Sequence, residues 1–254
     1  MILEEFDEVR TAVINPDMLI NRIVGFPKVG VTCFSKELLE SIIEKFESKI
    51  IAYVNSANGN IPIYVIKYKN IELALFNSRV GASACVGQIE EIIAMGMEKC
   101  IMFGTCGVLE HSIEELSIII PNSAIRDEGT SYHYMKETDE VSVNEKYIDE
   151  FINLLNKYNY KHIVGKTWTT DAFYRETANK VNKRKKQGAI CVEMECSAVS
   201  SLAKYRNIEF FNFFYAADNL GTSVWDERNL SCSKDLSEKG KIGLLALELA
   251  VKIV

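Results

Sequence analysis

The stretch CIMFGTCG, residues 100–107, decides the fold class of this chain. Its first four residues form a short apolar run, which is typical of a buried strand. The next four begin with Gly104 and end with Gly107, a pattern that lets backbone N–H groups approach an anion closely. Alone, the same pattern is also typical of an ordinary tight turn from a strand into a helix. In both interpretations a buried strand ends at residue 103 and a glycine-rich turn follows it.

Outward from this stretch, strand-like and helical patterns alternate along the chain. Strands are predicted at residues 29–34, 63–68, 71–76, 116–120, 162–167, 189–194 and 209–215, with a hairpin turn at Lys69 and Asn70. Helices are predicted after Ser35, between Gly81 and Gly96, at residues 145–156, from residue 195 to about 205, and at residues 234–253. This alternation predicts an α/β fold, with a mostly parallel central sheet flanked by helices. Because the chain shows no internal repeat and no Pro/Gly/Ser-rich linker, residues 1–254 are predicted to form a single domain.

The composition is that of an ordinary globular protein, with 48% hydrophobic and 25% charged residues. A net charge of -6 gives no basic excess for a phosphate backbone, so we expect no nucleic-acid partner. The chain shows no signal-peptide pattern and no run near the roughly 18 apolar residues of a membrane span, so we expect no membrane partner. Seven scattered cysteines are interpreted as reduced thiols in a cytoplasmic protein, and no cysteine or histidine spacing predicts a metal site.

Polar segments follow the ends of several predicted strands, where ligands bind in such sheets. Glu193 and Glu195 are two residues apart, so they share one face of the predicted extended strand. Two carboxylates this close repel each other, and a sugar diol, whose hydroxyl groups donate to carboxylates, is a ligand that would hold both. The alternative is that one or both carboxylates are simply solvated.

Two further segments combine apolar and polar residues. Asp218 follows the apolar strand at residues 209–215, where burial would raise its pKa and make it a proton donor. An aspartate that caps a helix or a turn is the alternative. Phe173 and Tyr174 come just after a polar segment and offer a surface for a flat base, although such aromatics also pack in cores.

Two other segments are polar. Residues 126–134, RDEGTSYHY, place two tyrosines around His133, and we interpret them as a pocket wall, although a lone histidine is more often structural. Residues 180–186 contain five lysines and arginines, and we interpret them as a solvated helix face.

Taken together, these segments resemble the nucleoside phosphorylase family, which includes bacterial purine nucleoside phosphorylases, uridine phosphorylases and related nucleosidases. The order of the motifs matches from about residue 20 to residue 254, and the strongest matches are residues 104–107, residues 192–195 and Asp218. Residues 124–134 look like the uridine-phosphorylase-like branch. The resemblance implies a phosphorylase/hydrolase-like fold, whose mixed central sheet is partly barrel-like.

The resemblance implies a role for each residue that matches a family motif. Asp218 matches the acid that protonates the purine N7 in purine-specific members, and Thr105 matches a hydroxyl that contacts phosphate. The residues implied for ribose are Glu193, Met194 and Glu195, with Glu195 on the 2′ and 3′ hydroxyls. The residues implied for the base are Cys106, Gly107, Phe173, Tyr174 and Arg175.

The chain departs from the family where the family holds phosphate. Met102 occupies a position that is often arginine, and the glycine–aspartate–proline phosphate loop, matched here to Gly25 and the residues after it, has Lys28 near the usual arginine. We therefore expect Gly25, Lys28 and Arg79 beside phosphate, with Arg126 and Arg175 as further candidate cations. If none of these cations reaches the site, phosphate is not the nucleophile.

The resemblance predicts a pentosyltransferase that cleaves a nucleoside with inorganic phosphate to give free base and ribose-1-phosphate. The acid near N7 favours a purine, while uridine stays possible because of the uridine-like segment and Arg175. We expect no metal and no organic cofactor, nucleoside and phosphate as the ligands, and a homo-oligomer, either a hexamer or a dimer. The main alternative is a nucleosidase that uses water. A binding or storage protein on the same fold is a further alternative, against which Glu195 and Asp218 argue.

Overall fold

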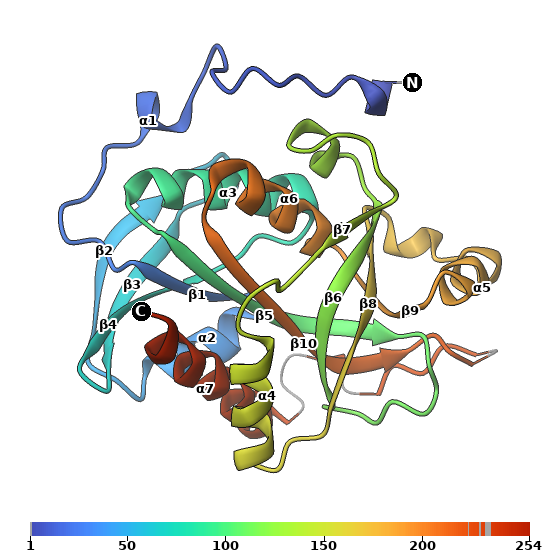
Figure 1. Cartoon of the computed structure of the whole chain (residues 1–254). Coiled ribbons are helices and arrows are strands. Elements are labelled where there is room, and N and C mark those ends of the chain that lie inside the picture. Colours follow the sequence, from blue (N-terminus) through green and yellow to red (C-terminus); the bar gives the residue numbers. More distant parts are fainter. Residues whose placement is uncertain (1, 223, 229, 232–234) are drawn as a thin grey trace.

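Strands and helices alternate in the computed structural model, which describes residues 2–222, 224–228, 230–231 and 235–254 (Figure 1). The strands are β1 (Val29–Cys33), β2 (Ser48–Val54), β3 (Ile61–Tyr68), β4 (Ile71–Asn77), β5 (Lys99–Val108), β6 (Ile118–Asp127), β7 (Glu140–Ser142), β8 (His162–Thr170), β9 (Ala189–Glu193) and β10 (Glu209–Asn219). The α-helices are α1 (Pro16–Leu19), α2 (Lys36–Ile43), α3 (Ala82–Met95), α4 (Ile148–Lys157), α5 (Ala178–Lys186), α6 (Cys196–Arg206) and α7 (Leu236–Ile253). Short 3-10 helices are η1 (Ile2–Glu4), η2 (Thr130–His133) and η3 (Phe173–Arg175).

These strands form one mixed sheet that is partly closed. Strands β2, β3, β4, β1 and β5 lie side by side in that order. From β5 the pairing continues through β10, β6, β8 and β9, and β9 pairs back onto β5. Five strands thus close into a ring, which leaves those strands without a free edge. The predicted α/β fold with a mixed, partly barrel-like sheet is confirmed.

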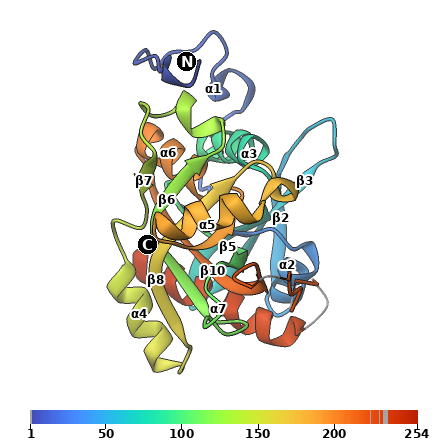
Figure 2. The ribbon, with the colours of Figure 1, turned by 90° about the vertical axis from the view of Figure 1, so that its right-hand side faces the viewer.

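Helices cover the sheet on two sides (Figures 1 and 2). Helices α3 and α6 lie together on one side, and α2, α4 and α7 lie together on the other. The predicted apolar face of α2 is buried, and Ser35 caps this helix by accepting a hydrogen bond from the Leu38 N–H. Helix α5 lies outside both layers, beside β9. Within the described residues, no helix is both long and apolar enough to cross a membrane.

The predicted hairpin is confirmed, because β3 and β4 pair antiparallel around Lys69 and Asn70. Both turn residues have left-handed backbones, with φ of 48° and 66°. Two consecutive positive φ angles define the turn that matches the twist of hairpin strands, and asparagine tolerates that conformation.

The predicted turn at residues 104–107 is wrong, because these residues lie inside β5, and Gly104, Thr105 and Cys106 pair with Phe214, Tyr215 and Ala216 of β10. The glycine is needed here for space, because a Cβ on Gly104 would lie 2.8 Å from Cδ2 of Phe34. Glycine inside a strand often marks such a close approach.

Two other strands also run further than predicted. Strand β6 continues through Pro121 to Asp127, and its register with β8 shifts just after the proline. Such a bulge accommodates a residue that cannot donate to the ladder. Strand β10 continues to Asn219, so Asp218 lies within a strand and not in a loop. The first residues of the segment at 124–134, which resembles the uridine-phosphorylase-like branch, also belong to β6.

Candidate active site

A cavity of about 1020 Å³ lies where β5, β9 and β10 end. In the sheet register Gly107 of β5 pairs with Val192 of β9, and Cys106 pairs with Ala216 of β10. Among the predicted site residues, those that line the cavity are Thr105, Cys106, Gly107, Phe173, Tyr174, Glu193, Met194, Glu195 and Asp218. The structure thus brings together residues that lie up to 113 positions apart in the sequence, from Thr105 to Asp218.

Gly107 makes room for the side chains on the neighbouring strand. A Cβ at this position would lie 2.4 Å from Cδ1 of Leu220 and 3.1 Å from Oδ1 of Asp218. The first distance is shorter than any normal contact between carbon atoms. Gly107 is therefore required for the close approach of the Asp218 carboxyl group to the floor of the cavity.

Asp218 is held by one hydrogen bond and is partly buried. The Trp225 indole N–H donates to its Oδ2 at 2.8 Å, and both residues line the cavity. Burial raises the pKa of Asp218, against the lowering effect of the bond from Trp225. A carboxyl group with a raised pKa in a cavity is suited to share or donate a proton, as the sequence predicted.

Glu193 is fully occupied by hydrogen bonds from its own protein. Its Oε2 accepts from the backbone N–H groups of Glu195 and Cys196 at 2.8 and 2.7 Å, and its Oε1 accepts from the Thr169 hydroxyl at 2.6 Å. The carboxylate therefore satisfies the free N–H groups at the start of α6. Burial nevertheless raises the pKa of Glu193 to about 7.

Glu195 does not share a strand face with Glu193, and that prediction is wrong. Strand β9 ends at Glu193, and Glu195 is the N-cap residue of α6, with φ of −135° and ψ of −28°. The Gly81 N–H donates to its Oε1 at 2.5 Å. Burial, and after it the charge of Glu193, raise the pKa of Glu195 to about 8. The turn between strand and helix still places both carboxyl groups on the cavity.

Phe173 and Tyr174 form an aromatic wall and are not core residues. They lie on η3, with 50% and 89% of their surfaces exposed, and their ring centroids are 4.1 Å apart. Both line the cavity. Exposed aromatic faces beside a cavity can stack on a flat ring, and the base-stacking role of these residues stays a prediction.

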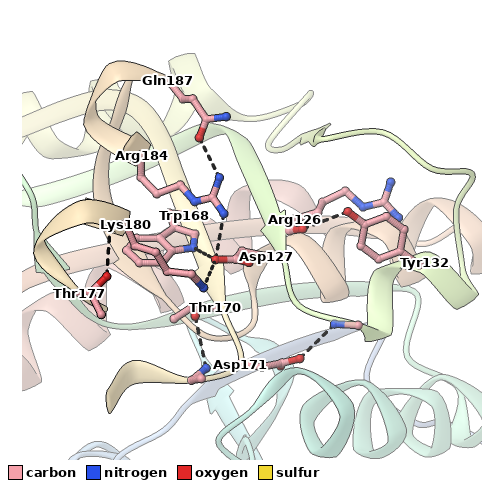
Figure 3. A network of polar contacts seen from close by, with 12 residues as sticks. Arg126, Asp127, Tyr132, Trp168, Thr170, Asp171, Thr177, Lys180, Arg184 and Gln187 are labelled. Carbon is pink, nitrogen blue, oxygen red and sulfur yellow. Dashed lines mark hydrogen bonds and ion pairs between the residues drawn. The ribbon is translucent and has the colours of Figure 1, made fainter. Parts of the chain in front are cut away.

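Asp127 anchors the helix that follows this wall, and sequence reasoning missed it (Figure 3). Its Oδ2 accepts from the Trp168 indole and from Lys180, and it pairs with Arg184 of α5, each at 3.0 Å. The cations of Lys180 and Arg184 also lie 5.9 and 5.6 Å from the centre of the Trp168 ring. The predicted solvated face at residues 180–186 is therefore wrong for these two residues, which attach α5 to the sheet.

The residues predicted to hold phosphate lie apart from the cavity, except Thr105. Gly25 and Lys28 precede β1, whereas Phe34, which lines the cavity, follows the other end of that strand. Lys28 pairs with Glu98 at 3.2 Å. The Arg79 guanidinium donates to the Gly59 carbonyl at 3.3 Å, and Arg79 does not line the cavity. Gly25 and Lys28 thus lie at the end of β1 opposite to the end that borders the cavity.

The two further candidate cations do not line the cavity either. Arg126 is buried, donates to Ser131 at 2.8 Å and to the Lys136 carbonyl at 2.7 Å, and stacks 4.0 Å from the centre of the Tyr132 ring. It therefore holds the segment around η2 together. Arg175 is exposed on η3 and lies outside the lining. Among the described lining residues the cationic side chain is Lys185, whose ammonium lies 3.7 Å from Glu110.

Comparison with known proteins identifies the family of this chain. The family model described as the phosphorylase superfamily matches residues 28–243. A guanosine phosphorylase from Halorubrum lacusprofundi is 23% identical over 184 residues, which cover 72% of this chain and 76% of that protein. A 5'-methylthioadenosine/S-adenosylhomocysteine nucleosidase from Buchnera aphidicola is 28% identical over 211 residues, which cover 78% of this chain and 91% of that protein.

Solved structures show the same fold. A uridine phosphorylase from Vibrio fischeri superposes with a TM-score of 0.74 at 18% identity, covering 96% of this chain and 97% of that one. A purine nucleoside phosphorylase from Toxoplasma gondii superposes with a TM-score of 0.74 at 16% identity, covering 97% and 96%. The match over residues 28–243 and the shared fold establish that this chain belongs to the phosphorylase superfamily, in which its relatives include both phosphorylases and nucleosidases.

Proposed function

We propose that this cavity cleaves the N-glycosidic bond of a purine nucleoside. The observation that carries the proposal is that Asp218 and Glu195 line one cavity from two separate elements, the end of β10 and the start of α6. One carboxyl group is available for the base and the other for the ribose. The aromatic pair Phe173 and Tyr174 lines the same cavity and offers a face for the base.

At the base end, Asp218 acts on the leaving group. The purine gains negative charge as the glycosidic bond breaks, and a proton at N7 neutralises that charge as it forms. Because burial raises the pKa of Asp218, its proton is more readily available near neutral pH than that of an exposed aspartate. A pyrimidine has no N7, so this acid favours purines.

At the ribose end, Glu195 is the acceptor for the 2′ and 3′ hydroxyl groups. Its backbone is fixed at the start of α6, and Oε1 is fixed by the Gly81 N–H. Glu193 supports this arrangement by holding the Glu195 N–H at 2.8 Å. We therefore assign Glu193 a positioning role, and the direct ribose contact to Glu195.

The charge of the lining favours water as the nucleophile. The carboxyl groups of Glu176, Glu193, Glu195 and Asp218 line the cavity together with the ammonium of Lys185. Among the described lining residues, Lys185 is the cation that could attract a phosphate dianion, whereas neutral water needs no cation. Carboxylates also offer acceptors for the proton that water loses. The nucleosidase reaction, giving free base and ribose, is thus the version that the geometry supports best.

Phosphorolysis is the second candidate, and two observations favour it. Thr105, the predicted phosphate hydroxyl, does line the cavity, and several relatives are phosphorylases. A phosphate site would need a cation beyond Lys185. A second copy in the predicted homo-oligomer, a hexamer or a dimer, is one source of such a cation. The oligomer, the cytoplasmic location and a reaction without metal or organic cofactor stay predictions.

Product analysis with and without phosphate separates the two candidates. The purified protein is incubated with inosine, adenosine or uridine, and base, ribose and ribose-1-phosphate are separated by chromatography. We expect purine base and free ribose at equal rates in both conditions, and slower release from uridine. Release that requires phosphate and yields ribose-1-phosphate would establish phosphorolysis instead. Release from uridine alone would contradict the proposal for purines.

A further inference from the structure

The Trp225 indole is an exposed aromatic group whose N–H is committed to the proposed acid. Trp225 is 55% exposed and lines the cavity, and its Nε1 donates to Oδ2 of Asp218 at 2.8 Å. A tryptophan side chain has one N–H donor and no acceptor, so this bond uses its whole hydrogen-bonding capacity. The proposed cleavage step gives this donor no role.

The segment that carries Trp225 is fixed against the end of β10. The backbone N–H groups of Asn219 and Asp226 donate to each other's carbonyls at 2.8 and 3.2 Å, which forms an antiparallel bridge one residue beyond the acid and the indole. Two residues further along, the Arg228 guanidinium donates to the Ile113 carbonyl at 2.8 Å. The backbone that follows the indole is thus tied both to β10 and to the connection between β5 and β6, which keeps the indole N–H on the acid.

The two carboxyl oxygens of Asp218 have different surroundings. Oδ2 accepts the indole N–H, whereas Oδ1 faces Gly107, where an added Cβ would lie 3.1 Å from it. In a protonated carboxyl group, the oxygen without the proton is the better acceptor. A donor that is fixed on Oδ2 therefore favours a proton on Oδ1, the oxygen at the floor of the cavity.

The indole also acts on the charge of Asp218. Burial raises the pKa of this carboxyl group, and the hydrogen bond from Trp225 is the largest of the effects that lower it. The charge of Arg228 lowers the same pKa further, and the charge of Asp226 raises it. The other ionisable groups among the described lining residues are Cys106, Tyr174, Glu176, Lys185, Glu193 and Glu195. The indole bond thus offsets part of the effect of burial on the acid.

We propose that Trp225 is a positioning residue, whose indole N–H holds Oδ2 of Asp218 and directs the carboxyl proton to Oδ1, on the Gly107 side of the cavity. This inference rests on the proposed function, because it gives the direction of the proton that the acid delivers. In that step the proton leaves Oδ1 for N7 of the purine while the electron pair of the glycosidic bond moves onto the base. The carboxylate that forms keeps the indole bond on Oδ2, which stabilises its new charge.

The first test compares the wild type with Trp225→Phe and Tyr53→Phe, using inosine and 4-nitrophenyl riboside. Phenylalanine keeps an aromatic ring and removes the N–H. Tyr53 is 48% exposed on β2, outside the cavity, so its variant controls for the loss of a polar hydrogen from an exposed ring.

We expect Trp225→Phe to lower kcat/KM for inosine by about tenfold or more. The nitrophenyl compound should react at nearly the wild-type rate, because its leaving group needs no proton. Tyr53→Phe should match the wild type with both substrates. Equal losses with both substrates in Trp225→Phe, or no loss with inosine, would overturn the inference.

The pH dependence of kcat/KM for inosine gives a readout that a purely structural role would not move. An acid must be protonated to act, so activity falls above its pKa, and loss of a donor that favours the carboxylate raises that pKa. We expect the alkaline limb of the profile to lie at a higher pH in Trp225→Phe than in the wild type. An alkaline limb at the same pH in both proteins contradicts the role of Trp225.

A further readout does not depend on catalysis. The chain has two tryptophans, Trp168 and Trp225, so the difference in emission between the wild type and Trp225→Phe isolates the fluorescence of Trp225. We expect this fluorescence to change as Asp218 titrates, and the change to be absent in Asp218→Asn. If the wild type cleaves no nucleoside but shows this change, the cleavage proposal fails and the hold of Trp225 on Asp218 stands. The same change in Asp218→Asn would overturn the inference.

Discussion

At the scale of single residues, Glu195 is held in the fold at a cost to stability. Its pKa is raised from 4.5 to about 8, so the fold favours the neutral carboxyl group. Because the pKa of Glu195 is higher in the folded than in the unfolded protein, its neutral carboxyl group favours folding fully below about pH 4.5. This contribution to the free energy of unfolding is lost as the pH rises to about 8, where the buried carboxylate must form. At about 1.4 kcal/mol per unit, the shift corresponds to a few kcal/mol.

Glu195→Gln should therefore remove a penalty that appears only at high pH. We expect its melting temperature to match the wild type near pH 5 and to exceed it by several degrees at pH 9, while nucleoside cleavage falls. Thermal denaturation across this pH range provides the measurement. Glu193→Gln is the matched comparison, since it weakens the acceptor of two backbone N–H groups and should destabilise the protein at both values. A pH-independent effect of Glu195→Gln would contradict the buried neutral carboxyl group.

A substitution at Gly107 tests whether activity depends on the position of Asp218 at the floor of the cavity. An alanine Cβ there would lie 2.4 Å from Leu220 and 3.1 Å from Asp218, so both side chains must move. We expect Gly107→Ala to lower kcat/KM by about 10- to 100-fold, because displacement of a catalytic group by about 1 Å has effects of this size. Steady-state kinetics with inosine measure the loss.

Gly87 provides the control for this glycine substitution. It lies inside α3, and a Cβ there would meet no atom within 4 Å. Gly87→Ala should keep wild-type kinetics and add about 0.5–1 kcal/mol of stability through helix propensity. Equal activity in Gly107→Ala and Gly87→Ala would show that the Asp218 position is not critical.

At the scale of elements, helix α5 depends on one carboxylate. Asp127 joins Lys180, Arg184 and Trp168, and the segment from η3 through α5 supplies much of the cavity wall. Asp127→Asn keeps an acceptor for the indole but loses the charge that pairs with two cations. We expect faster amide hydrogen exchange in residues 178–186 and a higher KM, with kcat changed less.

The exchange measurement has an internal reference within the same molecule. Helix α7, which packs against α2 and α4, should exchange equally in the wild type and in Asp127→Asn. Faster exchange throughout the chain would indicate global destabilisation, and unchanged exchange in α5 would show that the helix does not depend on Asp127.

The elements also show what the sequence can and cannot predict. The hairpin at Lys69 and Asn70 and the Ser35 cap were predictable because their signals are local. The end of β5 was not predictable, because Gly104 is needed to leave space for Phe34, a residue 70 positions away in the sequence. In a sequence, a glycine usually indicates a turn, whereas here Gly104 provides space inside a strand.

The residues of the candidate site also divide into those that the sequence predicts and those that it does not. Glu195 and Asp218 were predictable from their place after apolar strands and from the family motifs. Asp127 and Trp225 were missed, because the first acts through cations on a helix 53 and 57 positions later and the second through a contact with Asp218 that the fold creates.

At the scale of the whole molecule, the closed ring of strands explains how one chain assembles this cavity. Strands β5 and β10 run parallel, and β9 meets β5 antiparallel through only two residue pairs near the ends of both strands. The polar ends of three strands therefore converge on one volume. The helices on both sides bury the apolar faces of the sheet and leave this end of the ring open to a ligand.

The central claim is that Asp218 supplies the proton to a purine leaving group, and one measurement tests it most directly. The kcat/KM of the wild type and of Asp218→Asn is determined with inosine and with 4-nitrophenyl riboside, whose leaving group needs no proton. We predict a loss of about 10²- to 10⁴-fold with inosine and near-wild-type activity with the nitrophenyl compound. Equal losses with both substrates, or full activity of Asp218→Asn with inosine, would contradict the role of Asp218 as the acid.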